Sequence, residues 1–200
     1  MLSASLVRCC KSKTGLAQLM SILPNTPDEE RSGVDKNGDT MLTLVSKYGT
    51  AEMLQYLLDN DVDDLFETGE NGKTPLLAAC SGKGNLKKLK ILIDNDANIN
   101  VKDDNGDNCL TLAAGDGDRQ MLEFLVENGA DINKKGADDR TALLSACCTS
   151  GNLENLRYIL KETNANKKAK DSDGDNCMTL VAEFGDFLMF TLCPQCSLGT

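Results

Sequence analysis

Residues 105–125, NGDNCLTLAAGDGDRQMLEFL, are the stretch of the sequence that decides the fold. They begin with a polar turn, Asn-Gly-Asp, whose residues tolerate positive φ. A short helix rich in small apolar residues is expected next, then a Gly-Asp-Gly-Asp break, and then an amphipathic helix that contains Met121, Leu122 and Leu125. So small a unit cannot bury its apolar face alone, which predicts that copies of it stack on both sides.

Copies of this unit recur along the chain at a fixed interval. Residues 37–39 correspond to residues 105–107 and 173–175, with the same spacing both times (107 − 39 = 68 and 175 − 107 = 68). A related unit lies between these copies, because residues 72–80 match residues 139–147 (147 − 80 = 67). The repeat is therefore about 34 residues long. It alternates between two forms, which we call the odd repeats (starting near 35, 102 and 171) and the even repeats (starting near 69 and 135).

The repeated unit resembles the ankyrin repeat, a helical hairpin with a period of about 33 residues and the motif T-P-L-H-x-A. Residues 74–79, TPLLAA, carry the start of that motif. Residues 125–133, LVENGADIN, look like the family's ending, and residues 93–100, IDNDANIN, repeat it. The resemblance covers residues 35–186 well and residues 5–23 weakly. It implies an all-α, ankyrin-type solenoid of stacked helix-turn-helix repeats with short β-hairpin-like loops.

The sequence departs from the family motif at its histidine. Leucine stands there in the even repeats and threonine in the odd repeats, at Leu77, Leu144, Thr43, Thr111 and Thr179. The histidine usually ties neighbouring turns of the family together, so the departure implies looser loops in this chain.

We divide the chain into three parts. Residues 1–34 are expected to form an N-terminal cap or degenerate half-repeat, with helices near 5–11 and 15–23 and a polar loop at 25–33. Residues 35–186 are expected to form the ankyrin-repeat array. Residues 187–200 are expected to be a truncated or divergent C-terminal end, because a solenoid end needs a polar outer face and this one is apolar.

Short polar residues stand where the helices of the array should begin. Ser, Thr, Asp and Asn are the preferred N-cap residues because their side chains accept hydrogen bonds from the first turn. We therefore expect Thr40 to cap the first helix of repeat one. The second helices should be capped by Thr50, Asn85, Asp118, Asn152 and Asp186.

The charge balance and the residue types narrow the function. The chain has 21 Lys and Arg against 31 Asp and Glu, a net charge of −10, which disfavours nucleic acid as a partner. It contains no histidine, the commonest general base and metal ligand. We therefore expect no enzymatic activity and no cofactor. No apolar stretch approaches the roughly 18 residues that a membrane-spanning helix requires.

The nine cysteines lie largely at equivalent repeat positions, Cys10 with Cys80 and Cys147, and Cys109 with Cys177. This pattern indicates a core slot for a small apolar side chain. The odd count and a start without a signal-peptide pattern favour a reducing, cytoplasmic compartment. The pair at residues 193 and 196 could supply half of a zinc site, although stray terminal residues explain it more simply.

Two turns are dense in oxygen ligands, residues 103–107 and residues 171–175. A calcium loop of the EF-hand type has glycine at its sixth position and glutamate at its twelfth, whereas these turns have glycine fourth and lack that glutamate. Polar turns whose side chains bond to their own backbone are the simpler interpretation.

The resemblance implies that turn tips and outer positions of the first helices line a concave surface that binds partners. Core positions repeat because stacking requires it, whereas surface positions are free to differ between copies. Tyr48 and Phe184 are aromatic candidates for hot spots; an alternative for Phe184 is that it packs beneath the last repeat. The candidate partner-binding residues are Lys36, Asn37, Asp39, Lys47, Tyr48, Glu70, Asn71, Lys73, Ser81, Lys83, Asp104, Asn105, Asp107, Asp116, Arg140, Asp173, Asp175 and Phe184.

These features predict a non-catalytic protein–protein interaction scaffold or adaptor that is monomeric unless its C-terminal end associates. Because the chain is acidic, the expected partner is a protein with a basic patch, bound in a salt-sensitive way, and not nucleic acid or membrane. Two alternatives stay open. One is the interaction module of a larger enzyme or effector whose catalytic part is absent, and the other is a calcium-dependent binding array.

Overall fold

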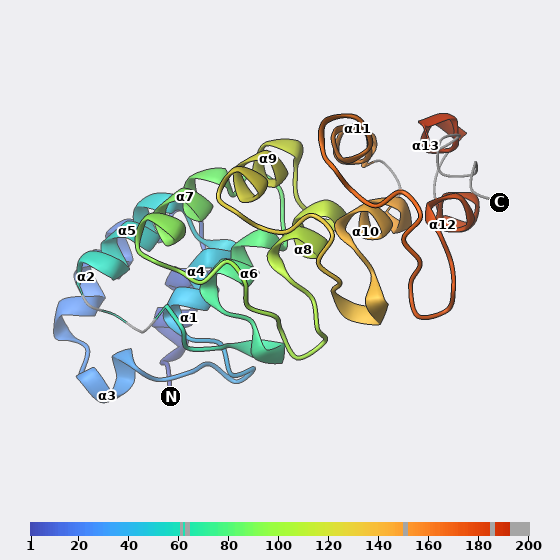
Figure 1. Ribbon diagram of the computed structural model, residues 1–200. Coiled ribbons are helices and arrows are strands. Elements are labelled where there is room, and N and C mark those ends of the chain that lie inside the picture. Colours follow the sequence, from blue (N-terminus) through green and yellow to red (C-terminus); the bar gives the residue numbers. More distant parts are fainter. Residues whose placement is uncertain (61, 63–64, 150–151, 185–186, 193–200) are drawn as a thin grey trace. The chain divides into compact units, whose positions relative to one another are not determined.

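The computed structural model describes residues 1–60, 62, 65–149, 152–184 and 187–192 (Figure 1). The secondary structure of these residues is helical, with isolated bridges at Lys102 and Asn108 and no strand. The chain divides into two compact units, which we describe separately. The first unit is Met1–Ala79 with Asn85–Asp104, and the second is Cys80–Gly84 with Asn105–Thr200.

The first unit is a stack of helical hairpins. Its first helices pack on one another, α1 on α4, and its second helices form another row in which α5 contacts both α2 and α7. Within a hairpin, α1 packs on α2 and α4 on α5. The elements are α1 (Ala4–Cys10), α2 (Leu16–Ile22), η1 (Leu23–Asn25), α3 (Asp28–Arg31), α4 (Met41–Tyr48), α5 (Ala51–Asp59), η2 (Glu70–Gly72), all but the last residue of α6 (Pro75–Cys80), and α7 (Leu86–Asp94).

The second unit repeats this arrangement. The first helices form one row, in which α10 contacts both α8 and α12, and the second helices form another, in which α11 contacts both α9 and α13. Hairpin partners α8 and α9, and α10 and α11, also pack together. The elements are α8 (Cys109–Gly115), α9 (Arg119–Glu127), η3 (Ala137–Asp139), α10 (Ala142–Cys148), α11 (Leu153–Glu162), α12 (Cys177–Phe184) and α13 (Phe187–Leu192).

The cores are built from the residues that recur. In repeat three, Leu110, Ala113 and Ala114 of the first helix and Met121 and Leu122 of the second are at most 2% exposed. The cysteines at equivalent positions occupy the same core slots, as their spacing predicts, and all are at most 2% exposed: Cys10, Cys80, Cys109, Cys147 and Cys177.

One segment differs from its expected structure. Residues 25–33, predicted to be a loop, contain the helix α3. Its three acidic residues all lie in the first turn, where they favour the positive end of the helix dipole. Arg31 fixes the segment, because its guanidinium donates to the carbonyls of Thr26 and Leu23, both at 2.9 Å. The polar composition of this segment is like that of a loop, and the sequence alone does not reveal the tertiary hydrogen bonds that hold it as a helix.

The predicted N-caps are partly correct. Thr40, Thr50 and Asp118 each accept a hydrogen bond from the backbone N–H three residues on. Asn85 and Asn152, in contrast, make no side-chain cap hydrogen bond, so this prediction was wrong for the even repeats. Their side-chain amides donate to carbonyls of first helices instead, at Ala79 and Ala114. The cap predicted at residue 186 lies outside the described residues.

The carbonyls at the C-terminal ends of α4 and α8, the first helices of repeats one and three, are satisfied by a side chain from the following even repeat. At α4 this side chain is Lys88 of α7, which is 4% exposed. Its Nζ donates to the carbonyls of Val45, Ser46 and Gly49 at 3.4, 2.5 and 3.2 Å. The last carbonyls of a helix have no partner from a following turn of the same helix; the Val45 carbonyl additionally accepts from the N–H of Gly49 at 2.9 Å. The donor therefore links one repeat to the next.

The second unit makes the same link with a different residue. Asn155 of α11 is the repeat equivalent of Lys88 (155 − 88 = 67), and its Nδ2 donates to the carbonyls of Ala113, Ala114 and Gly117 at 3.2, 3.2 and 3.3 Å. These carbonyls are the repeat equivalents of those that Lys88 contacts (113 − 45 = 68, 114 − 46 = 68 and 117 − 49 = 68). An amide can thus do in one unit what an ammonium does in the other.

Lys88→Asn is predicted to remove a pH dependence of stability. Burial, assisted by the charge of Lys13, lowers the pKa of Lys88 from 10.5 to about 8. Between these two pH values the unfolded chain binds a proton that the folded chain does not, so stability rises with pH. We expect the free energy of unfolding of the wild type, relative to Lys88→Asn, to increase by roughly 2–3 kcal/mol from pH 7 to pH 10.

Urea unfolding at both pH values measures this difference. Lys87→Asn is the matched control, because Lys87 is the exposed neighbour on the same helix and its substitution should leave the difference unchanged. Parallel pH profiles for wild type and Lys88→Asn would contradict the assignment.

Candidate partner-binding surface

An aspartate closes the turn that opens an odd repeat. In repeat one, Asp35 Oδ1 accepts from the backbone N–H groups of Asn37 and Asp39 at 2.8 and 3.1 Å. In repeat five, Asp171 Oδ1 accepts in the same way from Asp173 and Asp175 at 3.2 and 2.9 Å. The oxygen-rich turn at residues 171–175 therefore binds its own backbone. Among the described residues no group of three or more His, Cys, Asp or Glu is placed to hold a metal ion.

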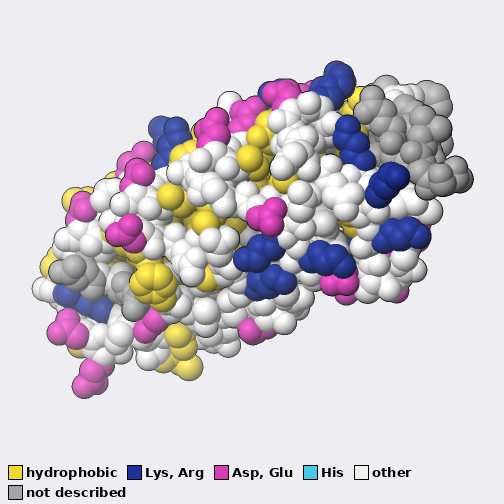
Figure 2. Space-filling view, in the orientation of Figure 1, with side chains coloured by type: hydrophobic (Ala, Val, Ile, Leu, Met, Phe, Trp, Pro, Cys, Tyr) yellow, Lys and Arg dark blue, Asp and Glu magenta, His cyan; other side chains and the backbone are white. Residues whose placement is uncertain are grey.

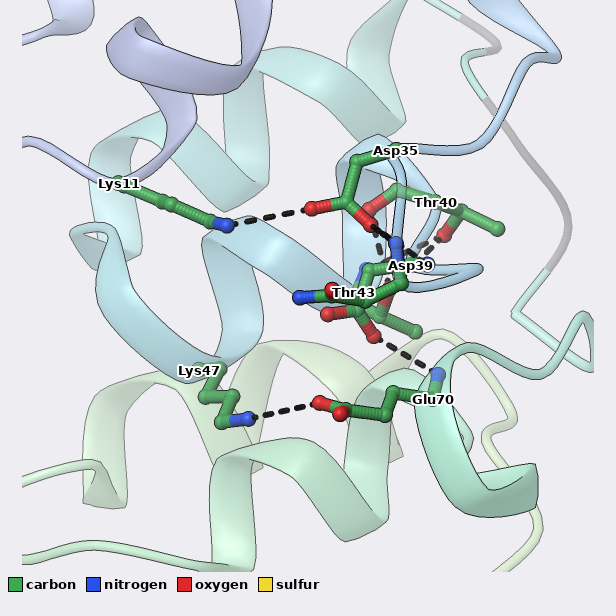
Figure 3. A network of polar contacts seen from close by, with 8 residues as sticks. Lys11, Asp35, Asp39, Thr40, Thr43, Lys47 and Glu70 are labelled. Atoms are coloured by element: carbon green, nitrogen blue, oxygen red, sulfur yellow. Dashed lines mark hydrogen bonds and ion pairs between the residues drawn. The ribbon is translucent and has the colours of Figure 1, made fainter. Parts of the chain in front are cut away.

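Each of these two aspartates also pairs with a cation from the preceding repeat. Lys11 Nζ lies 3.1 Å from Asp35, and Arg140 Nε lies 3.5 Å from Asp171 (Figure 3 shows the first pair). Both aspartate side chains are at most 2% exposed. Burial opposes the charge of Asp35, but the N–H of Asn37 and the Lys11 ammonium outweigh it and lower the pKa of this carboxyl.

A second aspartate ties each turn to the tip of the next repeat. Asp39 Oδ1 accepts from the N–H of Glu70 at 2.9 Å (Figure 3), and Asp107 Oδ1 accepts from the N–H of Ala137 at 3.3 Å and the hydroxyl of Thr111 at 3.0 Å. These carboxylates supply a tie between turns where the family histidine is missing. These ties oppose the loosening of the loops that the loss of the histidine implies.

The tips of the even repeats are exposed and strained in the same way. Asn71 and Asp138 both adopt positive φ, at 58° and 51°. Their carbonyls accept from the next tip, Asn71 from the N–H of Asp104 at 3.0 Å and Asp138 from the N–H of Ser172 at 2.8 Å. The backbone of each tip is thus held by a hydrogen bond to the next tip, while the side chains of Asn71 and Asp138 are exposed to solvent.

The structure separates the predicted residues by exposure. Tyr48 is 40% exposed and Phe184 is 45% exposed, whereas the alternative expectation for Phe184 was packing beneath the last repeat. Phe66, which the sequence analysis did not single out, is 58% exposed. Lys36, Asn37, Asn71, Lys83, Asp104, Asn105, Asp116 and Asp173 are also exposed; Lys47, Glu70, Lys73, Ser81, Asp107, Arg140 and Asp175 are half-buried; and Asp39 is buried.

The second unit contains a hollow of about 310 Å³ between α8, η3 and α10, which we call the α8–α10 hollow. It brings together three predicted residues, Asp107, Asp116 and Arg140. Its other lining residues come from α8, the tip, α10 and the residue after α10: Thr111, Leu112, Gly115, Ala137, Asp138, Ser145, Cys148 and Thr149. Burial raises the pKa of the Cys148 thiol, so this thiol is neutral at physiological pH.

The equivalent place in the first unit is occupied by side chains. Lys47 is the repeat equivalent of Gly115 (115 − 47 = 68), and Glu70 is the equivalent of Ala137 (137 − 70 = 67). Lys47 Nζ is 3.6 Å from Glu70 Oε2 and 5.2 Å from the centre of the Tyr48 ring (Figure 3 shows the ion pair). Glycine and alanine replace both members of this ion pair in the second unit, which accounts for the hollow. Only a comparison of the two copies in three dimensions reveals it.

The molecular surface carries both signs of charge. On the face shown in Figure 2, acidic and basic side chains are interspersed with small hydrophobic areas. None of the described helices has both the length and the apolar character needed to cross a membrane.

Comparison with known proteins agrees with this architecture. A family model described as ankyrin repeats (three copies) matches residues 6–103 and 82–171. No curated protein sequence matches the chain. Among solved structures, one match is a chain from the complex of a predatory endopeptidase of Bdellovibrio bacteriovorus with an immunity protein. It is 20% identical, with a TM-score of 0.78 over 98% of this chain and 99% of the other.

These matches confirm the all-α ankyrin-type solenoid predicted from the sequence. The family model spans well over half of the residues, and the tip-and-hairpin geometry recurs in both units. The chain therefore belongs to the ankyrin-repeat family.

Proposed function

We propose that the chain is a scaffold or adaptor that binds another protein through its exposed turn tips and first helices, and that it catalyses no reaction. Ankyrin repeats generally mediate protein–protein interaction. The observation that carries the proposal is a contrast between the copies. Thr43 recurs as Thr111 and both are buried, whereas Tyr48 on the same helix is replaced by Asp116 and both are exposed. Stacking fixes the inner positions, and the outer ones are free to specify a partner.

A protein is the class of partner that the comparisons support. The solved structure with the same fold is itself a complex of two proteins, an endopeptidase and an immunity protein. At 20% identity the likeness extends to the fold and not to the identity of the partner. A binding role also suits a chain without histidine, which lacks the residue that most often acts as general base.

The partner that fits best has a basic patch. The chain carries a net charge of −10, and Asp104, Asp116 and Asp173 are exposed at predicted binding positions. Complementary charge speeds association and excludes wrong partners. Cysteines placed in the core favour a reducing, cytoplasmic compartment, in which we propose that the chain acts as a monomer.

Binding is predicted to weaken with salt, because screening shortens the reach of exposed charges. A partner isolated by affinity purification from the native cell can be titrated into the chain by calorimetry at low and high ionic strength. We expect the dissociation constant to rise about tenfold between ~50 and ~300 mM salt. A constant that ignores ionic strength would argue against a basic partner.

Reversing exposed charges on the proposed surface should weaken the same complex. Asp104→Lys and Asp116→Lys are each expected to raise the dissociation constant by roughly five- to twentyfold, by placing like charges opposite a basic patch. Glu127→Lys is the charge-matched control, because Glu127 is exposed at the end of the second helix α9, away from the tips. Equal effects from all three substitutions would mean that only net charge matters and that the surface is placed wrongly.

A further inference from the structure

We propose that the α8–α10 hollow accepts a lysine side chain of the partner protein, which occupies the place that Lys47 holds in the other unit. The inference rests on the proposed protein-binding function and names the chemistry of one contact within it. It is drawn from the internal duplication of the chain, in which one copy of the place is filled and the other is open.

The filled copy shows what the place binds. Lys47 is half-buried, and its ammonium lies near the carboxylate of Glu70 and the ring of Tyr48. Burial opposes the charge, but Tyr48, Asp39 and Glu70 outweigh it and raise the pKa of Lys47. The surroundings therefore stabilise an ammonium group at this point of the fold.

The open copy keeps one of the three groups that surround the ammonium, the aspartate, and loses the cation. Asp107 stands where Asp39 stands (107 − 39 = 68), with its carboxylate at the base of the turn. Gly115 removes the lysine and Ala137 removes the glutamate. Asp116 replaces Tyr48, so the carboxylate that is lost with Glu70 is replaced by a carboxylate at a different position of the hollow.

The remaining charges favour a cation over an anion. Three aspartates line the hollow, Asp107, Asp116 and Asp138, against one guanidinium, Arg140. The charge of Arg140 is compensated by Asp171, 3.5 Å away. A partner group that brings a positive charge therefore gains, whereas a carboxylate or phosphate would meet net negative charge.

The size of the hollow suits a long side chain. Its volume is about 310 Å³, and an engineered protein cavity of about 150 Å³ holds a benzene molecule. A lysine stem can lie along the apolar part of the wall, which includes Leu112 and Ala137, with its ammonium at the carboxylates. Lysine is the occupant to which the duplicate points, because lysine is what fills the same place at Lys47.

Two double substitutions close the hollow in the second unit and open the equivalent place in the first. Gly115→Lys with Ala137→Glu rebuilds the ion pair of the first unit and fills the hollow; a Cβ at Gly115 would meet only Thr149 Oγ1, at 3.7 Å, so the side chain has room. Lys47→Gly with Glu70→Ala opens the equivalent place in the first unit. Asp116→Asn is a milder third variant that leaves the volume unchanged, and urea unfolding checks that all variants fold.

The probe is the tripeptide acetyl-Gly-Lys-Gly-amide, titrated into the isotopically labelled chain by NMR, with the Nε-acetylated lysine peptide as its uncharged control. We expect amide shifts around Gly115 and Ala137 with a dissociation constant of about 1–10 mM. The acetylated peptide and the filled variant should show none, Asp116→Asn should weaken binding, and the opened variant should acquire a second site near residue 47. Shifts spread over all acidic tips, or no shift at the hollow, would overturn the proposal.

The purified partner separates this inference from the proposed function. If the partner binds and the filled variant raises its dissociation constant at least tenfold, both stand. If the partner binds and the filled variant has no effect, the lysine contact is wrong while the protein-binding function stands. If no protein binds the chain at all, the proposed function fails, and the proposal of a partner lysine fails with it even where the tripeptide binds.

Discussion

The last carbonyls of α4 and of α8 find their side-chain donor outside their own repeat, and the rest of the structure depends on how they are satisfied. The next repeat supplies the donor, an ammonium at Lys88 in one unit and an amide at Asn155 in the other. Both are buried, so water cannot substitute for them. Burial of apolar residues brings the hairpins together, and these hydrogen bonds join the end of a first helix to the repeat that follows it.

The turns that precede the first helices also bond to neighbouring repeats. Asp35 closes its own turn and takes a cation from the preceding repeat, while Asp39 accepts from the backbone of the following one. A single turn is thereby joined to neighbours on both sides. The acidic residues that give the chain its negative charge are consequently divided into two groups, those that hold the loops together and those, such as Asp116, that remain exposed.

Periodicity was sufficient to predict the hairpins, their order and the core cysteines, because these depend on patterns within one repeat. The caps at Thr40, Thr50 and Asp118 were predicted from their residue types, because the bonds that they accept lie within one turn of helix. Asn85 and Asn152 were assigned wrongly because the extra residue before the second helix of an even repeat carries their side chains to carbonyls of first helices. The α8–α10 hollow could not be predicted, since it arises from two small residues, Gly115 and Ala137, that meet only in the folded chain.

The donors Lys88 and Asn155 belong to even repeats, and the first helices that accept from them belong to odd repeats. This alternation has a consequence for the growth of such an array. An odd repeat supplies the acceptors and an even repeat supplies the donor, so neither is a self-sufficient building block. The chain can be lengthened or shortened by a module of one odd and one even repeat without leaving any junction mismatched. Loss of an even hairpin alone would instead bring two odd repeats face to face, and the acceptors of the first would then lack their donor.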